Sequence, residues 1–179
     1  MSQSVELVCI TYKGGDRVAT GDKTQLSVED VFAQYGNMLY RTAFVMMKNQ
    51  YDAEDAVQDT LIKYMEYRKP FEGEEHRKAW LLRVLINNCK NRLRFYRNHP
   101  GISMEELSAY YEKNADTEVM EQLLQLPRKY REVLMLHYVE GYQGREIAAL
   151  LKITEAAVRK RLERGRRQLQ ERMGGGENV

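Results

Sequence analysis

The residues best suited to chemistry by type and spacing are the acidic side chains of the segment 52–59. Asp52, Asp55 and Asp59 lie three and four residues apart, so a helix would place them on one face. Carboxylates arranged in this way could hold Mg²⁺ for a reaction on pyrophosphate. The sequence offers no convincing second acidic helix and no phosphate-cradling loop to complete such a site. We therefore favour a solvated face or a partner-binding face, and we predict no catalytic residue and no metal.

Basic residues form two blocks, which indicates contact with nucleic acid. The net charge is only +2, but Lys and Arg are concentrated in two segments. The first block, within 76–98, contains no acidic residue and comprises Arg77, Lys78, Arg83, Lys90, Arg92, Arg94 and Arg97. The second, within 155–172, comprises Arg159, Lys160, Arg161, Arg164, Arg166, Arg167 and Arg172. An acidic stretch separates them, so two contact surfaces are favoured, although solvated helix faces would explain either block alone.

The first basic block also contains an aromatic residue and amides. Trp80 lies among Arg and Lys residues and is followed by Asn87 and Asn88. This combination suits a surface that binds unpaired bases by stacking and holds the phosphate backbone. Trp80 taken alone would more often fill a core.

The second basic block lies in a helix-turn-helix pattern. Ile147, Ala148 and Leu151 would face inward from a first helix, and Val158 and Leu162 from a second. Thr154 is placed to cap the second helix, and Ala148 is small where that helix crosses. This arrangement leaves Arg159, Lys160 and Arg164 facing outward, where they could read base edges or contact phosphates in a major groove. An ordinary amphipathic hairpin with a solvated basic face is the alternative.

Lys152 is unusual, because such turns often place glycine there. A left-handed conformation would cost a non-glycine residue roughly 1 kcal/mol. We therefore expect a turn of different shape and an altered pitch of the second helix.

Helices are expected throughout the chain apart from its tails and one linker. Capping residues and apolar periodicity predict helices that begin after Ser27 and at Asp52, followed by one over 75–96. Asp52 is expected to cap the second of these, with Asp55 as its partner. Four more are predicted over 118–125, 128–139, 143–151 and 155–172. A short strand over 5–12 and a helical turn after Ser103 are weaker expectations.

These elements predict an all-α fold of two small helical domains. A tail (1–26) precedes a three-helix domain (27–98), and an acidic linker (99–117) leads to a helix-turn-helix domain (118–173) and a C-terminal tail (174–179). No stretch of about 20 apolar residues occurs, and the N-terminus lacks a secretory pattern. Cys9 and Cys89 show no metal-ligand spacing. We interpret them as reduced thiols of a cytoplasmic protein.

Four segments in this order resemble sigma factors, the initiation subunits of bacterial RNA polymerase. DAEDAVQD at 52–59 and AWLLRVLINNCKN at 79–91 resemble region two, the second of these being the part concerned with promoter melting and the minus-ten element. LPRKYREVL at 126–134 and EIAALLKITEAAVRKRL at 146–162 resemble region four, including its minus-thirty-five helix-turn-helix. The resemblance spans 28–172, and the absence of other sigma regions between them is typical of the extracytoplasmic-function type. Lys152 and Ala157 depart from the family's pattern.

The resemblance implies a transcription-initiation factor and not an enzyme. Core polymerase is the implied partner, through its β′ clamp helices and β flap, together with promoter DNA and a candidate anti-sigma protein; no cofactor is implied. The helix that docks on the clamp helices would carry Asp52, Glu54, Asp55 and Gln58. The melted minus-ten strand would lie near Trp80, Arg83, Asn87, Asn88 and Asn91, and the minus-thirty-five duplex near Arg159, Lys160 and Arg164.

The sequence leaves two alternatives to the sigma-factor function. A stand-alone helix-turn-helix regulator would need a dimer interface and a palindromic site, and no heptad or exposed apolar strip obviously supplies one. A metal-dependent hydrolase would rest on the 52–59 carboxylates alone.

Overall fold

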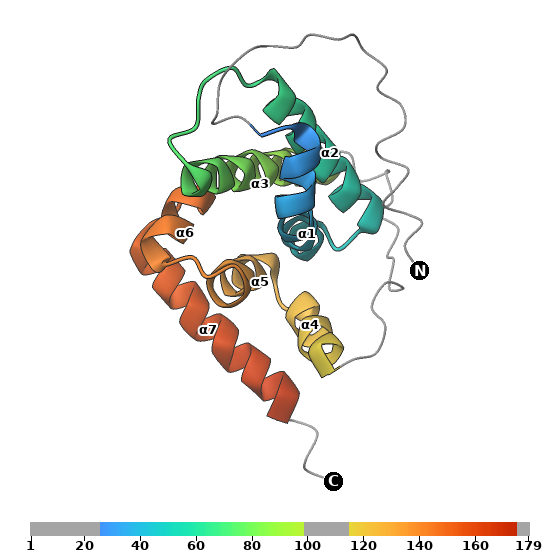
Figure 1. Cartoon of the computed structure of the whole chain (residues 1–179). Helices are drawn as coiled ribbons and strands as arrows, with labels where there is room; N and C mark the ends of the chain where they lie inside the picture. Colours follow the sequence, from blue (N-terminus) through green and yellow to red (C-terminus); the bar gives the residue numbers. More distant parts are fainter. Residues whose placement is uncertain (1–25, 99–114, 175–179) are drawn as a thin grey trace.

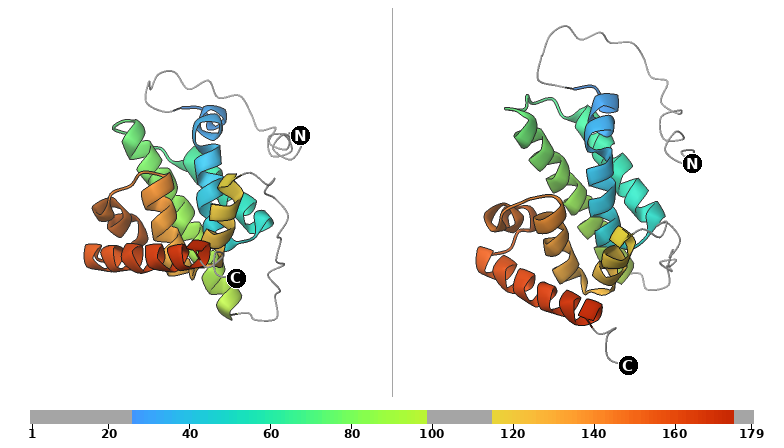
Figure 2. Two further views of the ribbon diagram at one scale, coloured as in Figure 1. Left: turned by 90° about the horizontal axis from the view of Figure 1, so that it is seen from below. Right: turned by 60° about the horizontal axis from the view of Figure 1, so that its bottom comes forward.

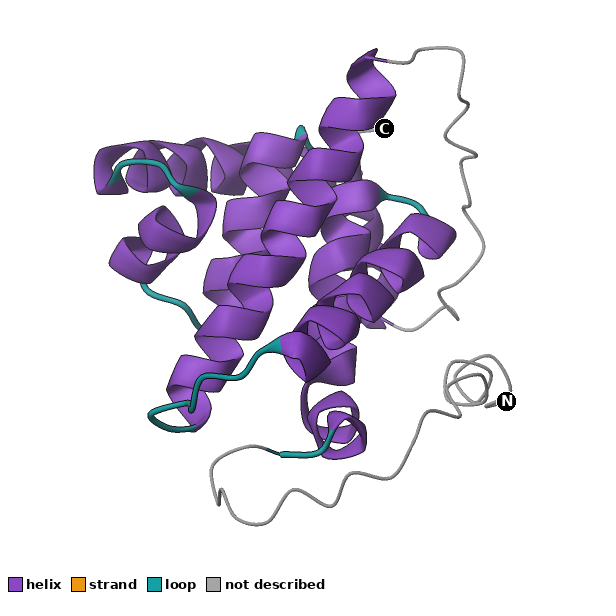
Figure 3. Cartoon of the chain, turned by 90° about the horizontal axis from the view of Figure 1, so that it is seen from above, coloured by secondary structure: helices purple, strands orange, loops and turns teal. Residues whose placement is uncertain are grey.

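The computed structural model describes residues 26–98 and 115–174, and all regular structure within these two ranges is helical (Figure 1, Figure 3). The all-α prediction is therefore confirmed for the described residues. The strand expected over 5–12 and the turn expected after Ser103 lie outside them. Within the described ranges, no helix combines the length and apolar character needed to cross a membrane.

The first helix, α1 (Val28–Met47), begins where the sequence predicted. Ser27 is its N-cap, and the Ser27 hydroxyl accepts a hydrogen bond from the backbone N–H of Asp30 at 3.1 Å. Lys48 closes the helix in the left-handed conformation, at φ 58°. One side of α1 is buried, through residues such as Val31, Leu39 and Ala43, which fixes it as the centre of the N-terminal half.

The start of α2 (Gln50–Glu66) corrects the predicted cap. Asn49, not Asp52, is the N-cap, and its side-chain oxygen accepts from the backbone N–H of Asp52 at 3.0 Å. The N-cap therefore lies three residues earlier than expected. Asp52 falls within the first turn, and its carboxylate is free to bond elsewhere. A cap and an acidic first-turn residue are hard to tell apart by sequence alone, because both favour Asp.

The third helix, α3 (Glu74–Asn98), completes the predicted three-helix bundle. It packs on α1 and α2 through Leu81, Leu82, Leu85, Ile86 and Cys89, all of which are fully buried. Burial raises the pKa of the Cys89 thiol to about 12. The thiol is therefore protonated at neutral pH and serves as core packing.

The C-terminal half is built from four α-helices and one π-helical turn. These are α4 (Ala115–Gln125), α5 (Arg128–Leu134), the π-helical turn η2 (Met135–Val139), α6 (Gly144–Leu151) and α7 (Glu155–Gly174). The start of α4 lies three residues before the predicted one. Gly141 adopts φ 76° after η2, a conformation that glycine tolerates best, and it lies in the gap between the helices predicted over 128–139 and 143–151.

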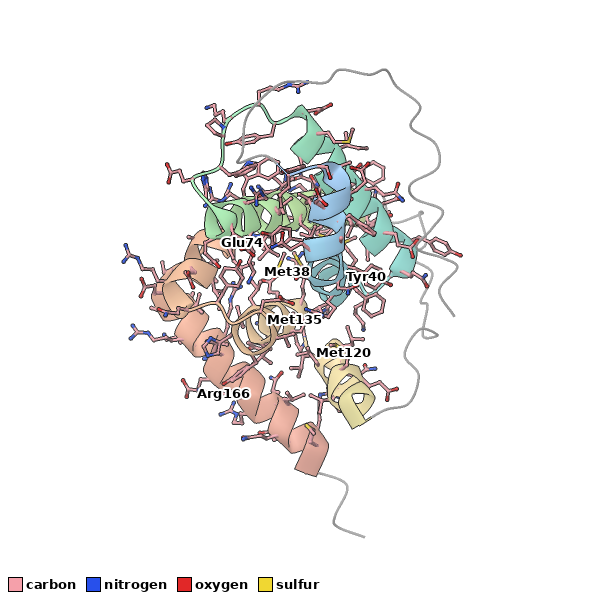
Figure 4. The ribbon with its side chains drawn as sticks, in the orientation of Figure 1. Met38, Tyr40, Glu74, Met120, Met135 and Arg166 are labelled. Carbon is pink, nitrogen blue, oxygen red and sulfur yellow. The ribbon has the colours of Figure 1, made fainter. Side chains whose placement is uncertain are left out.

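The two halves are packed against each other. Residues of α1, α3, α5 and α6 share one buried cluster, and α5 lies between α1 and α7 (Figure 1, Figure 2). Met38 on α1 and Met135 at the start of η2 lie along this seam (Figure 4). The sequence predicted two domains joined by a linker and gave no sign of this interface, because the residues that form it read as ordinary core positions of each half.

Candidate nucleic-acid and partner interfaces

The helix-turn-helix forms as predicted from α6 and α7. Ile147, Ala148 and Leu151 are buried on α6, and Val158 is buried on α7. The Thr154 hydroxyl accepts from the backbone N–H of Ala157 at 3.1 Å and caps α7. Arg159, Lys160 and Arg164 are exposed. The second helix therefore presents cationic side chains that a major groove could receive.

The turn between α6 and α7 does not have the altered shape expected from Lys152. Lys152 adopts the left-handed conformation that glycine usually occupies, with φ 57° and ψ 52°. The backbone N–H of Ile153 bonds to the carbonyl of Ala148 and closes the turn. Packing of the two helices thus outweighs the local cost of a lysine there.

Gly165 sets how closely α7 approaches α5, a role that the sequence did not reveal. A Cβ atom at this position would lie 3.0 Å from Leu134 Cδ1 and 3.2 Å from Tyr130 Cβ. A larger residue would require Leu134 and Tyr130 to give way by a few tenths of an ångström. The sequence carries no signal for this role, because Leu134 and Tyr130 precede Gly165 by some thirty residues.

Arg161 belongs to the second basic block but serves inside the fold. Its guanidinium Nη1 lies 3.3 Å from Oε1 of Glu132, a buried carboxylate on α5. Burial raises the pKa of Glu132, although the nearby cations, Arg128 foremost, oppose that shift. The pair holds α7 on α5 and leaves the exposed cations of α7 to face solvent.

Asp52 does not share a solvent-facing surface with Asp55, contrary to the prediction. It is buried and turns toward α3, where its carboxylate accepts from Arg92 at 3.0 Å and from the Tyr96 hydroxyl at 2.6 Å. Arg92 also bonds to Asp55 at 2.9 Å. Burial disfavours the Arg92 cation, but the hydrogen bonds to Asp55 and Asp52 outweigh burial and raise its pKa. Asp52 and Arg92 thus join α2 to α3.

An exposed strip runs along α2, and the sequence predicted only its polar residues as a contact surface. The exposed fractions of Tyr51, Ile62 and Met65 are 63%, 53% and 41%. With Asp55 and Gln58 between them, the strip has the alternating four- and three-residue spacing by which a helix meets a partner helix. A heptad search of 51–65 could have found it, since apolar residues recur there on the face opposite the core.

A groove lies between α2 and α3, and it brings two predicted DNA-contacting residues next to the acidic ones. Its lining residues are Asp52, Asp55, Asp59, Asn88, Asn91, Arg92, Phe95 and Tyr96. Asn88 is engaged between the helices, through hydrogen bonds with Lys63 and with Thr60. Asn91 is exposed in the groove. Both amides therefore lie beside the acidic residues of α2.

Trp80 belongs to an aromatic cluster that closes the loop between α2 and α3. Its ring lies 4.6 Å from Tyr67 and 5.7 Å from Phe71, and the Arg77 guanidinium lies 5.5 Å from the Phe71 ring. Trp80 is half-buried, so it both packs the loop and offers an edge to solvent. Arg83 is exposed and Asn87 half-buried one and two turns further along α3.

Among the described residues, no cluster of three or more His, Cys, Asp or Glu side chains could hold a metal ion. The carboxylates of Asp52 and Asp55 are engaged by an arginine instead.

These features define a class: an all-helical DNA-binding protein with a helix-turn-helix module packed on a three-helix module. Residues 31–98 match the family described as Sigma-70 region 2, and residues 116–169 match Sigma-70, region 4. The chain belongs to the sigma-70 family of RNA polymerase sigma factors and is of the extracytoplasmic-function type. It acts in promoter recognition with RNA polymerase, as its two regions and relatives establish.

Curated relatives match over most of their length. The chain is 27% identical to the extracytoplasmic-function sigma factor SigM of Mycobacterium tuberculosis over 150 residues, covering 82% of this chain and 76% of SigM. It is 26% identical to SigW of Bacillus subtilis over 176 residues, covering 88% and 93%. It is 30% identical to SigV of Bacillus subtilis over 129 residues, covering 70% and 78%.

Two solved structures share the fold. One is the sigma factor RpoE in complex with the anti-sigma factor NepR from Bartonella quintana, with a TM-score of 0.64 and 23% identity, covering 83% of this chain and 98% of that one. The other is CnrH in complex with the cytosolic domain of CnrY, with a TM-score of 0.56 and 24% identity, covering 84% and 89%.

Proposed function

We propose that this sigma factor docks on core polymerase through the exposed strip of α2, with Glu54, Asp55 and Gln58 at its centre and Tyr51, Ile62 and Met65 along it. An exposed helix face with heptad spacing fits a coiled-coil partner such as the β′ clamp helices. Asp52 contributes indirectly and does not contact the polymerase. Its hydrogen bonds with Arg92 and Tyr96 hold α2, which carries the strip, against α3. Residues 27–98 and 118–173 are the two domains in this proposal, and the β flap is a second contact on the polymerase.

The minus-ten surface in this proposal centres on Trp80, Arg83 and Asn87. The half-buried Trp80 edge and the exposed Arg83 cation suit a stacked base and a phosphate, respectively. Asn88 and Asn91 lie in the groove beside Asp55 and Asp59. Carboxylates repel phosphates, so these two amides act at the edge of the DNA surface and border the polymerase-docking strip.

The minus-thirty-five surface consists of Arg159, Lys160 and Arg164 on α7. All three are exposed while Val158 is buried beneath them. Arg159 is placed near the start of the helix, where recognition helices contact base edges. Arg164 lies more than one turn further along and suits a phosphate contact.

The protein works by binding and is not an enzyme; chemistry stays with the polymerase. It acts in the cytoplasm, where polymerase and promoter DNA are found. In one solved structure of similar fold the sigma factor RpoE is in complex with the anti-sigma factor NepR, and in the other CnrH is in complex with the cytosolic domain of CnrY. An anti-sigma protein is accordingly a further proposed partner, and the apolar residues of the α2 strip are its natural target.

The observation that carries this proposal is the simultaneous exposure of the α2 strip and the α7 cations on one chain. The test is transcription with purified protein and bacterial core polymerase on a promoter library. We expect Arg159→Ala to weaken initiation about tenfold, the scale of one lost base contact. Asp55→Ala should weaken polymerase binding and leave duplex binding unchanged.

Matched controls are available on the same helices. Glu66→Ala removes an exposed acid from α2 beyond the strip, and Arg172→Ala removes an exposed cation from the far end of α7. Both should initiate as the parent does. If the parent protein shifts DNA alone and never redirects core polymerase, the proposal fails and a stand-alone regulator takes its place.

A further inference from the structure

Arg77 of α3 is a buried cation within the N-terminal half. It is 7% exposed, and its guanidinium lies over the ring of Phe71, 5.5 Å from the ring centroid. Burial raises the pKa of the Tyr35 and Tyr64 hydroxyls, and the nearby Arg77 charge opposes that rise in both. Arg77 therefore lies among aromatic side chains that come from α1, from α2 and from the loop between α2 and α3.

A charge in this position is costly, which indicates a directional role. An aliphatic side chain would fill the same space without the free-energy cost of removing a cation from water. A guanidinium over an aromatic face is attracted by the ring electrons, and this attraction depends on where the ring lies. Arg77 therefore holds the Phe71 ring at a defined place, which an aliphatic contact would do less strictly.

Phe71 connects this cation to Trp80. Phe71 is 1% exposed, and its ring lies 5.8 Å from Tyr64, 5.0 Å from Tyr67 and 5.7 Å from Trp80, which it meets edge-on. Aromatic pairs at such distances favour particular angles between their rings. The orientation of the Trp80 ring thus depends on Phe71, and the position of Phe71 depends on Arg77.

The neighbouring residue His76 holds the backbone of the same loop. The backbone N–H of Glu72 donates to Nδ1 of His76 at 3.2 Å, and the His76 ring meets Phe71 edge-on at 5.5 Å. Because a backbone N–H can only donate, Nδ1 is the unprotonated nitrogen in this contact. A side chain in the first turn of α3 therefore reaches back to the preceding loop, much as the acidic residue of a capping box does.

We propose that Arg77 and His76 are positioning residues of the minus-ten surface. By ordering the loop of residues 67–73, they hold the half-buried Trp80 ring in the orientation that receives an unpaired base. The inference rests on the proposed function, which assigns base stacking to Trp80. Neither positioning residue contacts DNA, so Arg77 serves the surface through Phe71 and not through a phosphate.

The advantage of this arrangement is that the stacking ring is ordered before DNA arrives. Side chains that become ordered only on binding lose conformational entropy, and that loss weakens the complex. A ring held by Arg77 and Phe71 has already lost this freedom during folding. The buried cation therefore improves the capture of a base without adding a contact to it.

The test uses the fluorescence of Trp80, which is the only tryptophan in the chain. Full-length parent protein is compared with Arg77→Met, which removes the charge and keeps the length, and with Arg77→Lys, which keeps the charge. Arg92→Met is the matched control, because Arg92 is another cation of α3 that bonds to α2, through Asp52 and Asp55. Each protein is titrated with a short oligothymidylate, since stacking tolerates any base, and separately with a mixed-sequence duplex.

We expect the Trp80 emission of Arg77→Met to move to longer wavelength and its quenching by acrylamide to increase, because the ring becomes less ordered and more exposed. The affinity for oligothymidylate should fall about tenfold, the scale of one desolvated cation–π contact, while duplex binding stays at the parent's level. Arg77→Lys should recover most of the affinity. Arg92→Met should lower the midpoint of thermal unfolding and leave the Trp80 emission unchanged.

The dependence on salt separates positioning from direct contact. A residue that binds a phosphate of single-stranded DNA contributes about 0.7 to the slope of log affinity against log salt concentration. Arg77→Met should keep the parent's slope, and a slope reduced by that amount would overturn the proposal. Parental emission and affinity in Arg77→Met, or an equal loss of single-strand and duplex binding, would overturn it as well.

A pair of substitutions at His76 decides the matter if Arg77→Met does not fold. His76→Phe keeps an aromatic ring beside Phe71 and removes the acceptor for the Glu72 N–H, whereas His76→Asn keeps an acceptor. We expect the Phe variant to shift the Trp80 emission and the Asn variant to stay close to the parent. Identical emission in the two variants would count against the proposal.

The parent protein distinguishes this inference from the proposed function. If oligothymidylate leaves the Trp80 emission of the parent unchanged, the minus-ten surface of the proposed function is refuted, and the positioning role falls with it. If the parent responds and Arg77→Met responds equally at the same concentrations, the positioning role alone is refuted.

Discussion

The two halves use the same kind of residue in opposite ways. Both carry a dense block of Lys and Arg, on α3 and on α7. On α3 much of that block is consumed inside the molecule: Arg77 is buried, Lys90 caps α6, and Arg92 holds Asp52 and Asp55. On α7 most of it faces solvent, whereas Arg161 is half-buried and pairs with the buried Glu132. A basic block of similar composition therefore stays largely exposed in one half and is largely engaged in contacts within the fold in the other.

The largest expected loss of stability is in the C-terminal half, because α7 packs closely on α5 at Gly165. Gly165→Val should destabilise the C-terminal half by about 3 kcal/mol, since the added atoms collide with Leu134 and Tyr130. Urea unfolding followed by circular dichroism measures this loss. Ala156→Val, at an exposed position of α7, serves as the control and should unfold close to the parent's midpoint.

The contribution of Arg92 of α3 to stability can be tested by changing its partner Asp52. Asp52→Ala leaves Arg92 and Tyr96 without their shared acceptor, and we expect a loss of about 2 kcal/mol. This figure is below that for a fully buried pair, because Arg92 keeps partial contact with water. Asp55→Ala, which removes the exposed acceptor of the same arginine, should cost less than about 1 kcal/mol. Equal losses in the two variants would contradict the distinction between scaffold and surface.

The contact between Arg161 of α7 and Glu132 of α5 gives a pH prediction. Burial raises the pKa of this carboxyl in the folded state, against the opposing effect of Arg128 and other cations. The folded state therefore binds the proton more tightly than the unfolded state, so this group's contribution to stability falls as pH rises from the unfolded pKa through the folded pKa. Glu132→Gln should flatten the plot of unfolding free energy against pH in that window. An unchanged slope would show that the cations neutralise the effect of burial.

The sequence predicted features that depend on local interactions and missed those that depend on long-range ones. The Ser27 and Thr154 caps act over three residues, and the inward positions of the helix-turn-helix follow from the helical period of apolar residues; both were predicted. Asp52 was misassigned because its partner Arg92 is 40 residues away. Arg131 went unnoticed because its acceptor Met46 is 85 residues away. The candidate DNA-binding residues came from resemblance and charge, and their roles remain predictions.

The smallest expected effect concerns a feature that the two halves share. In each, a helix is closed by a lysine in the left-handed conformation, Lys48 after α1 and Lys152 after α6. Glycine adopts this conformation without strain, so Lys152→Gly and Lys48→Gly should each stabilise the protein by about 0.5 to 1 kcal/mol, less the entropy that glycine gains in the unfolded chain. Thermal unfolding of both variants measures the gain. A loss of stability in either variant would mean that the lysine side chain stabilises that helix end by more than the strain costs.

The effect on function can be tested at Lys152, because that residue precedes the helix that carries Arg159. If Lys152→Gly stabilises the fold yet weakens binding to a minus-thirty-five duplex, the strained turn sets the angle at which α7 meets DNA.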